Sequence, residues 1–270
     1  MKLLEKFKTN GYIICKGIVD IDLLDNHLSG VYSLYNVFNK PSKELEKKRK
    51  PWESQLFHKE LIEFRKKKPG LFSCFYDSLQ NCSSLTSLVF SDSLINMSAK
   101  LLGIKKNQLI AVAQQTRADV PNDKRNALNW HQDWSYFPTT KEALTLWFPL
   151  YEMTDKSGYL QILSKSHRTG IISGIADKID ETKFKKKNYA ITHQKKIPDA
   201  IINTHETKDV KITRGDVVFF DTCLSHRSGQ NTSNNVRFSC QNRLQNSTAK
   251  DYVPFRVYMK ENPYIKNKLL

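Results

Sequence analysis

Hydrophobic residues recur every three or four positions in much of the first hundred residues, a spacing typical of amphipathic helices. The segment NHLSGVYSLYNVF (26–38) has this pattern. The segment DSLINMSAKLLG (92–103) begins with a capping Asp and ends with Gly103, a residue favoured just after a helix. A short strand is predicted in GYIICKG (11–17). We therefore expect a mainly helical region over residues 1–108.

From about residue 109 the pattern changes to short runs rich in β-branched and aromatic residues, separated by turn residues. Many short strands of this kind are typical of a jelly-roll sandwich or barrel. We predict a mainly β fold with N-terminal helices, organised as one domain over 1–270. Its core spans about 109–245, with a Lys-rich insertion at 171–207. The predicted strands are 109–117, 143–153, 158–164, 209–213, 216–222 and 236–244.

The composition supports a folded chain, because 39% of the residues are hydrophobic and 14 are Phe. No apolar run reaches the ~18 residues that a membrane span requires, and the N-terminus does not have the pattern of a secretory signal. The five cysteines are scattered without a CxxC pair, which argues against a zinc ribbon or a disulfide framework. We expect a soluble cytoplasmic protein with no membrane partner.

The net charge of +16 raises the possibility of a nucleic-acid partner. The basic clusters at 43–50, 65–68 and 183–187 are dispersed, however, and no aromatic residues are interleaved with them as in a stacking platform. We favour solvated surfaces over a nucleic-acid interface.

The stretch WHQDW (130–134) carries the first candidate chemistry. In an extended segment, His131 and Asp133 project from the same face, so both could bind one metal ion. From these two residues alone, a buried His–Asp hydrogen bond is an equally good interpretation. His226 is the best third ligand, because it ends the aromatic run GDVVFFDTCLSH, which we predict to be a strand. Two His and one carboxylate form the facial triad of non-haem Fe(II) oxygenases.

A candidate anion-binding pair follows His226. Arg237 lies eleven residues further along, beyond the turn-rich RSGQNTSNN, and we predict that the two flanking strands form an antiparallel hairpin. A fixed guanidinium there can bind a carboxylate with two hydrogen bonds, and the Ser228 hydroxyl can add a third. The alternatives are an exposed strand charge or ion pair for Arg237 and an ordinary turn residue for Ser228.

At this point the sequence resembles the phytanoyl-CoA dioxygenase family of Fe(II)/2-oxoglutarate-dependent oxygenases. The resemblance covers most of residues 5–245. It is carried by EKFKTNGYIICKGIVD (5–20), WHQDWSYFP (130–138), LTLWFPLYEMTDKSGYLQILSKSHRTG (144–170) and GDVVFFDTCLSHRSGQNTSNNVRFS (215–239). The pattern HxD, then SGYLQILSKSH, then H-x-S-x₈-R is far more specific than HxD alone. One departure is Lys165, where the family commonly has Gly.

The resemblance implies a double-stranded β-helix, a cupin-like jelly roll, that uses Fe(II), 2-oxoglutarate and O₂ and releases succinate and CO₂. It implies that His131, Asp133 and His226 are the iron ligands and that Arg237 and Ser228 hold the distal carboxylate of 2-oxoglutarate. It also matches Trp147 to a pocket aromatic, for which a plain core position is the alternative. Because related halogenases lack the carboxylate ligand, Asp133 favours hydroxylation.

Polar residues in the predicted pocket strands bear on the substrate. Gln115 and Arg117 share one strand face, and Ser239, Gln241 and Arg243 share the face of Arg237. Buried arginines require anions, so we predict that the substrate is a small polar, anionic metabolite and that Gln115, Arg117 and Arg243 contact it. An acyl-CoA hydroxylase, a nucleic-acid-directed oxygenase and a non-enzymatic jelly-roll binding module are the alternatives. The sequence leaves the oligomeric state open.

Overall fold

The computed structural model describes residues 3–123, 128–172, 175–176 and 195–254. Seven helices precede the main β region in these ranges, and helix α2 begins after its cap Asp20, whose side chain accepts from the Asp22 backbone N–H. The α-helices are α1 (Leu3–Asn10), α2 (Ile21–Phe38), α3 (Lys43–Glu46), α4 (Gln55–Lys67), α5 (Pro69–Ser78), α6 (Ser83–Val89), α7 (Asp92–Leu102) and, later, α9 (Asp199–Ile202).

The ten strands of the described residues form three antiparallel sheets, with orders β1-β8-β3-β10-β2, β7-β4-β9 and β5-β6. Their bounds are β1 (Tyr12–Cys15), β2 (Leu109–Asp119), β3 (Ala143–Pro149), β4 (Leu160–Leu163), β5 (Ile175–Ala176), β6 (Lys195–Lys196), β7 (Thr207–Val210), β8 (Val217–Asp221), β9 (His226–Ser228) and β10 (Arg237–Asn246). The two larger sheets form the double-stranded β-helix that the sequence predicted.

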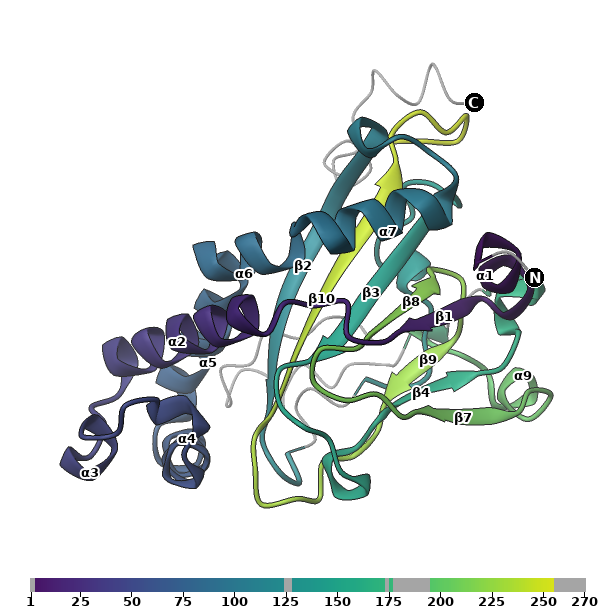
Figure 1. Ribbon diagram of the computed structural model, residues 1–270. Coiled ribbons are helices and arrows are strands. Elements are labelled where there is room, and N and C mark those ends of the chain that lie inside the picture. The colour runs from purple at the N-terminus through teal and green to yellow at the C-terminus, as the bar shows by residue number, and fades with distance from the viewer. Residues whose placement is uncertain (1–2, 124–127, 173–174, 177–194, 255–270) are drawn as a thin grey trace, which may run out of the picture.

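Helices α2, α6 and α7 lie across the outer face of the five-stranded sheet (Figure 1). Alternate residues of β3 and β10, such as Leu146 and Phe238, point outward and join the helices in the larger hydrophobic core. A smaller apolar cluster, which includes Ile162 and Phe220, joins the inner face to the three-stranded sheet. The inner face of β10 is polar instead, and it faces the space where the site lies.

The HxD segment extends the smaller sheet. His131 and His226 form a two-way backbone bridge, with N–H···O distances of 3.0 and 2.9 Å. Gln132 is extended, and Asp133 opens a short 3₁₀ turn, Asp133–Ser135. This bridge places the segment beside β9, although the two are far apart in the sequence.

Two local predictions are wrong. His226 does not end the aromatic strand, because β8 stops at Asp221, where its carboxylate accepts from the Cys223 N–H at 2.7 Å and turns the chain. His226 therefore opens β9 in the other sheet. The predicted hairpin with the Arg237 strand is also absent among the described residues, since β9 pairs with β4 and β10 pairs with β2 and β3.

Other boundaries differ by a few residues: the predicted strand 143–153 ends at Pro149, and the strand predicted at 209–213 lies at Thr207–Val210. Gly103 ends α7 with a φ of +70°, as predicted. Most of the predicted insertion 171–207 lies outside the described residues. No helix within the described ranges is long and apolar enough to cross a bilayer.

Candidate metal centre

Three buried side chains come together beside β9 of the smaller sheet: His131, Asp133 and His226. Their candidate ligand atoms all lie within 4.8 Å of one another. The Asp133 Oδ1 is 4.0 Å from the His131 Nε2 and 3.9 Å from the His226 Nε2. These distances are too long for a hydrogen bond, so the alternative of a buried His–Asp hydrogen bond does not describe this site.

The backbone fixes which nitrogen of each imidazole faces the centre. The His131 Nδ1 donates to the Asn129 carbonyl at 2.7 Å, and the His226 Nδ1 donates to the Leu224 carbonyl at 3.0 Å. A carbonyl can only accept, so each Nε2 directs a lone pair inward. Burial lowers the pKa of His131 to about 3 and also lowers the pKa of His226, which keeps both rings neutral.

Asp133 is held at both oxygens. The Thr145 hydroxyl donates to Oδ2 at 2.6 Å, and the Arg243 guanidinium donates to Oδ1 at 3.0 Å. Burial alone would raise the pKa of Asp133, but the charge of Arg243 outweighs it and holds the pKa well below its usual range. Thr145 therefore orients a carboxylate that is ionised and directs Oδ1 toward the two histidines.

This donor set fits a divalent iron ion. Two neutral imidazoles and one carboxylate are the ligands of the facial triad, which leaves other metal positions open. Metal-binding histidines usually donate their other ring N–H to an acceptor, and metal-binding carboxylates usually accept a hydrogen bond, as these three residues do. The prediction that the HxD residues share one face is confirmed.

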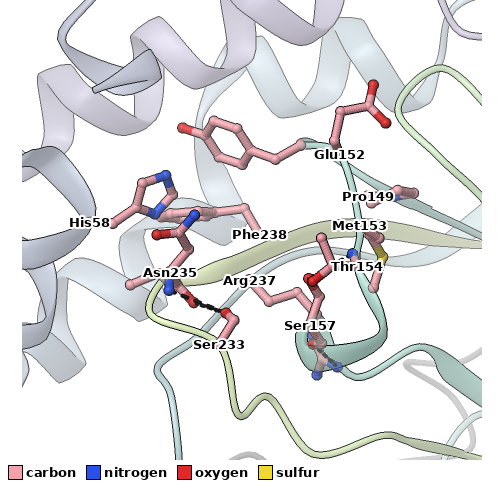
Figure 2. Close-up of a pocket in the computed structure, with 12 residues that line it drawn as sticks. His58, Pro149, Glu152, Met153, Thr154, Ser157, Ser233, Asn235, Arg237 and Phe238 are labelled. Atoms are coloured by element: carbon pink, nitrogen blue, oxygen red, sulfur yellow. Dashed lines mark hydrogen bonds between the residues drawn. The ribbon is translucent and has the colours of Figure 1, made fainter. Parts of the chain in front are cut away.

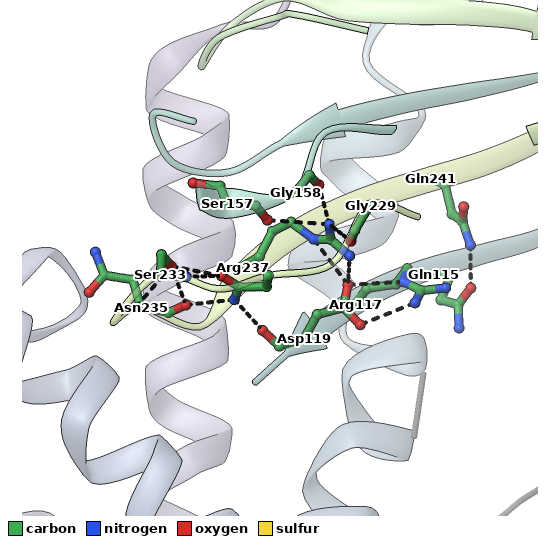
Figure 3. Close-up of polar contacts among 11 residues, drawn as sticks. Gln115, Arg117, Asp119, Ser157, Gly158, Gly229, Ser233, Asn235, Arg237 and Gln241 are labelled. Carbon is green, nitrogen blue, oxygen red and sulfur yellow. Dashed lines mark hydrogen bonds and ion pairs between the residues drawn. The ribbon is translucent and has the colours of Figure 1, made fainter. Parts of the chain in front are cut away.

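Arg237, the first residue of β10, is held in a closed set of contacts (Figure 3). Its Nε and Nη2 donate to the Asp119 Oδ2 at 3.2 and 2.7 Å. Its Nη1 donates to the carbonyls of Gly158 and Gly229, the latter at 2.9 Å. Arg237 is thus a buried, fully oriented cation and not an exposed strand charge.

Gly158 and Gly229 allow the two loops whose carbonyls accept from Arg237 to lie close together. Gly158 has a φ of +77°, and a Cβ on either Gly158 or Gly229 would collide with the backbone of the other loop. The two loops can therefore approach this closely only because positions 158 and 229 carry no side chain. The turn that the sequence marks with Gly158 has a specific function, since it delivers one of the carbonyls that orient Arg237.

Asp119 is the residue that the sequence analysis missed. Its carboxylate forms ion pairs with both Arg237 and Arg117, and the Arg117 Nη2 lies 3.1 Å from the Asp119 Oδ1. Burial favours the neutral acid, but the two guanidinium groups hold the pKa of Asp119 below its usual range. The period-two pattern through Gln115 and Arg117 could have indicated this position, because residue 119 falls on the same face.

A cavity of about 280 Å³ opens beside this cluster, lined by residues that include Ser228, Asp119, Asn129 and Arg237. The structure thus brings Ser228 and Arg237 to one pocket. A smaller cavity of about 100 Å³ lies on the other side of Arg237, between β10 and α4, with His58 and Phe238 in its wall (Figure 2).

The remaining predicted site residues have other neighbours. The Gln241 side-chain Nε2 donates to the Gln115 side-chain Oε1 across β10 and β2. Trp147 lies in the inner apolar cluster with Phe220, whose ring centre is 4.7 Å from that of His226. The argument that Arg117 and Arg243 require an anion from the substrate is wrong, because Asp119 and Asp133 supply their anions. Both arginines are buried, as predicted.

Several solved structures share this fold. The epimerase SnoN from nogalamycin biosynthesis, described as non-heme and alpha-ketoglutarate dependent, has a TM-score of 0.60 and 15% identity, over 97% of this chain and 88% of that one. The non-heme monooxygenase ThoJ has a TM-score of 0.57 and 16% identity, over 91% and 77%. EctD from S. alaskensis with bound Fe has a TM-score of 0.56 and 16% identity, over 94% and 80%.

No curated protein is significantly similar to this chain in sequence. The family model described as phytanoyl-CoA dioxygenase, however, matches residues 7–239. That range contains the strands of both larger sheets up to the first residues of β10, together with the three candidate ligands and Arg237. The chain belongs to the phytanoyl-CoA dioxygenase family of Fe(II)/2-oxoglutarate-dependent oxygenases.

Proposed function

We propose that this protein hydroxylates a C–H bond of a small polar, anionic metabolite in a reaction that consumes 2-oxoglutarate and O₂ and releases succinate and CO₂. The proposal is carried by the buried His131–Asp133–His226 cluster and by the oriented cation Arg237, whose cavity is also lined by Asn129 and Ser228, each two residues from one of the histidines. Together they provide a place for the metal and a place for the far carboxylate of a dicarboxylic cosubstrate.

The chain's own residues have distinct tasks. The Nε2 atoms of His131 and His226 and the Oδ1 of Asp133 would hold Fe(II). Arg237 and the Ser228 hydroxyl, which line the same cavity, would fix the distal carboxylate of 2-oxoglutarate. Bound Fe(II), with 2-oxoglutarate and O₂, supplies the oxidising chemistry. The inner apolar cluster, with Trp147 and Phe220, excludes water from one side of the centre.

Charge supports an anionic substrate. The contacts among the described residues bring three guanidinium groups, Arg117, Arg237 and Arg243, together with the carboxylates of Asp119 and Asp133. The two histidines are neutral, so this set carries one net positive charge. Fe(II) and the 2-oxoglutarate dianion add charges that cancel. One positive charge therefore remains for an anionic group of the substrate, because an uncompensated buried charge is costly.

A structural neighbour bears on the size of the substrate. SnoN, which shares the fold, was crystallised with Fe3+, alpha ketoglutarate and nogalamycin RO, a small molecule. This supports a small-molecule substrate.

The test is a screen for succinate release with Fe(II), 2-oxoglutarate and a panel of small carboxylate and phosphonate metabolites, beside a panel of acyl-CoAs. Product mass should rise by one oxygen for a member of the first panel. His131→Ala and His226→Ala should abolish the reaction, and Arg237→Ala should raise the KM for 2-oxoglutarate by a factor of at least about 30, since breaking a buried charged pair costs ~2–5 kcal/mol. Coupled turnover of acyl-CoAs alone would reject the substrate class, and full activity of both histidine variants would reject the metal centre.

A further inference from the structure

Arg243 is placed at the metal centre itself. It projects from the inner face of β10, is 6% exposed, and donates from Nη2 to the Asp133 Oδ1 at 3.0 Å. Its guanidinium carbon lies 4.7 Å from the centre of the Phe137 ring, so that ring covers one side of the cation. Its buried Nε has no hydrogen-bond partner among the described residues.

The oxygen that Arg243 holds is the same one that faces the two histidines. The Asp133 Oδ1 is within 4.0 Å of each Nε2 atom, while Thr145 occupies Oδ2. Because Thr145 fixes the carboxylate, Oδ1 cannot be exchanged for Oδ2 without loss of that hydrogen bond. A metal ion held by the triad and the Arg243 cation must therefore share one oxygen atom.

We infer that Arg243 opposes metal binding at this centre and that an anionic ligand in the same pocket relieves the opposition. The inference rests on the metal centre of the proposed function. A guanidinium and a divalent cation repel each other strongly at such separations, even at an effective dielectric constant of about 20. In the metal-free protein, Arg243 also neutralises Asp133, so its removal raises the energy of that state. Both effects favour metal binding once the charge is removed.

Arg243 consequently determines specificity. When the metal shares Oδ1, the Asp133 charge no longer neutralises Arg243 alone, and the buried Nε of Arg243 still lacks an acceptor. A carboxylate, phosphate or phosphonate group of the substrate can supply both the negative charge and the acceptor. The metal-loaded site therefore selects an anionic substrate, and it selects one whose anionic group lies close to the bond that reacts.

The test measures Mn(II) affinity without substrate or cosubstrate, by the EPR signal of unbound Mn(II) in a titration of the full chain. Arg243→Gln and Arg243→Met remove the charge and should bind Mn(II) at least tenfold more tightly than the native protein. Tenfold corresponds to only ~1.4 kcal/mol. Arg243→Lys keeps the charge and should stay within about threefold of native. Arg168→Gln, at an exposed arginine that donates to the Thr9 carbonyl, is the remote control and should be native-like.

Thermal melting gives a second readout. Mn(II) should raise the melting temperature of Arg243→Gln and Arg243→Met by more than that of the native protein. A neutral variant that is unfolded without metal should fold when Mn(II) is added. An unchanged or weaker Mn(II) affinity, or a neutral variant that stays unfolded with Mn(II), overturns the inference. His131→Ala separates this from the proposed function: if it binds Mn(II) like the native protein, the metal centre itself is wrong.

Discussion

Replacement of Asp119 by Asn tests whether one carboxylate neutralises the two arginines of the cosubstrate pocket. Asp119 is 7% exposed, and its carboxylate oxygens lie 3.1 Å from the Arg117 Nη2 and 2.7 Å from the Arg237 Nη2. An Asn side chain keeps the shape and one acceptor oxygen, but it removes the negative charge. Two buried cations then face each other without their shared anion.

The structure indicates a large effect. Removal of one partner from a buried ion pair typically destabilises a protein by ~3–5 kcal/mol. Because Asn still accepts one hydrogen bond, we expect the lower end, about 3 kcal/mol. For a chain of this size each kcal/mol shifts the melting temperature by roughly 2–4 °C. The metal-free variant should therefore melt about 6–12 °C below the native protein.

Cosubstrate should reverse part of this loss. The distal carboxylate of 2-oxoglutarate brings back a negative charge beside Arg237, so 2-oxoglutarate with Mn(II) should raise the melting temperature of Asp119→Asn by more than that of the native protein. Differential scanning calorimetry with and without the ligands measures both effects.

Asp123→Asn is the matched control. Asp123 lines the same cavity and pairs with Arg65, but it is 24% exposed, so this change should cost at most about 1 kcal/mol. The reasoning is refuted if Asp119→Asn melts within 1–2 °C of the native protein, or if 2-oxoglutarate stabilises the variant less than the native chain.

Three further predictions concern single side chains. Thr145→Val should weaken Mn(II) binding about tenfold or more in a titration, because Asp133 loses the hydroxyl that orients it; unchanged affinity would contradict this. Burial lowers the pKa of His58 to about 4, below its unfolded value of ~6.5, so the stability it contributes at neutral pH is lost as the pH falls from ~6.5 to about 4. His58→Phe should therefore lose less stability than the native protein between pH 7 and 5 in thermal melts, and an identical loss would refute the assignment. Lys165 has a φ of +61°, so Lys165→Gly should stabilise the fold by about 1 kcal/mol in denaturant titrations, and a destabilised variant would show that the Lys side chain compensates.

The sequence predicted His131 and Asp133 as a pair because they are two residues apart in an extended segment. His226 was chosen because it follows an aromatic run, although that strand ends at Asp221 and His226 opens the next one. Lys165 was singled out where the family commonly has Gly, and its left-handed backbone conformation explains that preference.

The turn between β8 and β9 was missed for an equally physical reason. Apolar residues resume at Cys223 and Leu224 after Asp221 and Thr222, so periodicity gave no sign that the chain leaves one sheet and enters the other. The break depends on Asp221, which caps the turn with its own side chain. A single polar residue at the end of an aromatic run does not distinguish a turn from a strand that carries one exposed position.

The pairing of Asp119 with Arg237 joins residues 118 positions apart, and only the register of β2 on β10 brings them opposite each other. The sequence analysis assigned Arg237 to an external anion because its internal partner could not be recognised. The same holds for Arg243 and Asp133, 110 positions apart. Strand register thus determined the counter-ion of Arg237, and the tertiary placement of the HxD segment determined that of Arg243, whereas the partner of Arg117 is only two residues away.

The alternation of polar and apolar residues along β10 is ordinarily the pattern of a strand with one face in water. Here every residue of the strand is buried, because β10 lies between β2 and β3 and its polar face is turned inward. Polar atoms in such a place cost about 1–3 kcal/mol each when they have no partner. The Ser239 Oγ, the Arg243 Nε and the Gln245 Oε1 are three such atoms on this face, within the described residues. A ligand that gives these atoms partners recovers that free energy on binding, so the inner face of β10 exchanges stability of the empty protein for affinity toward a polar substrate.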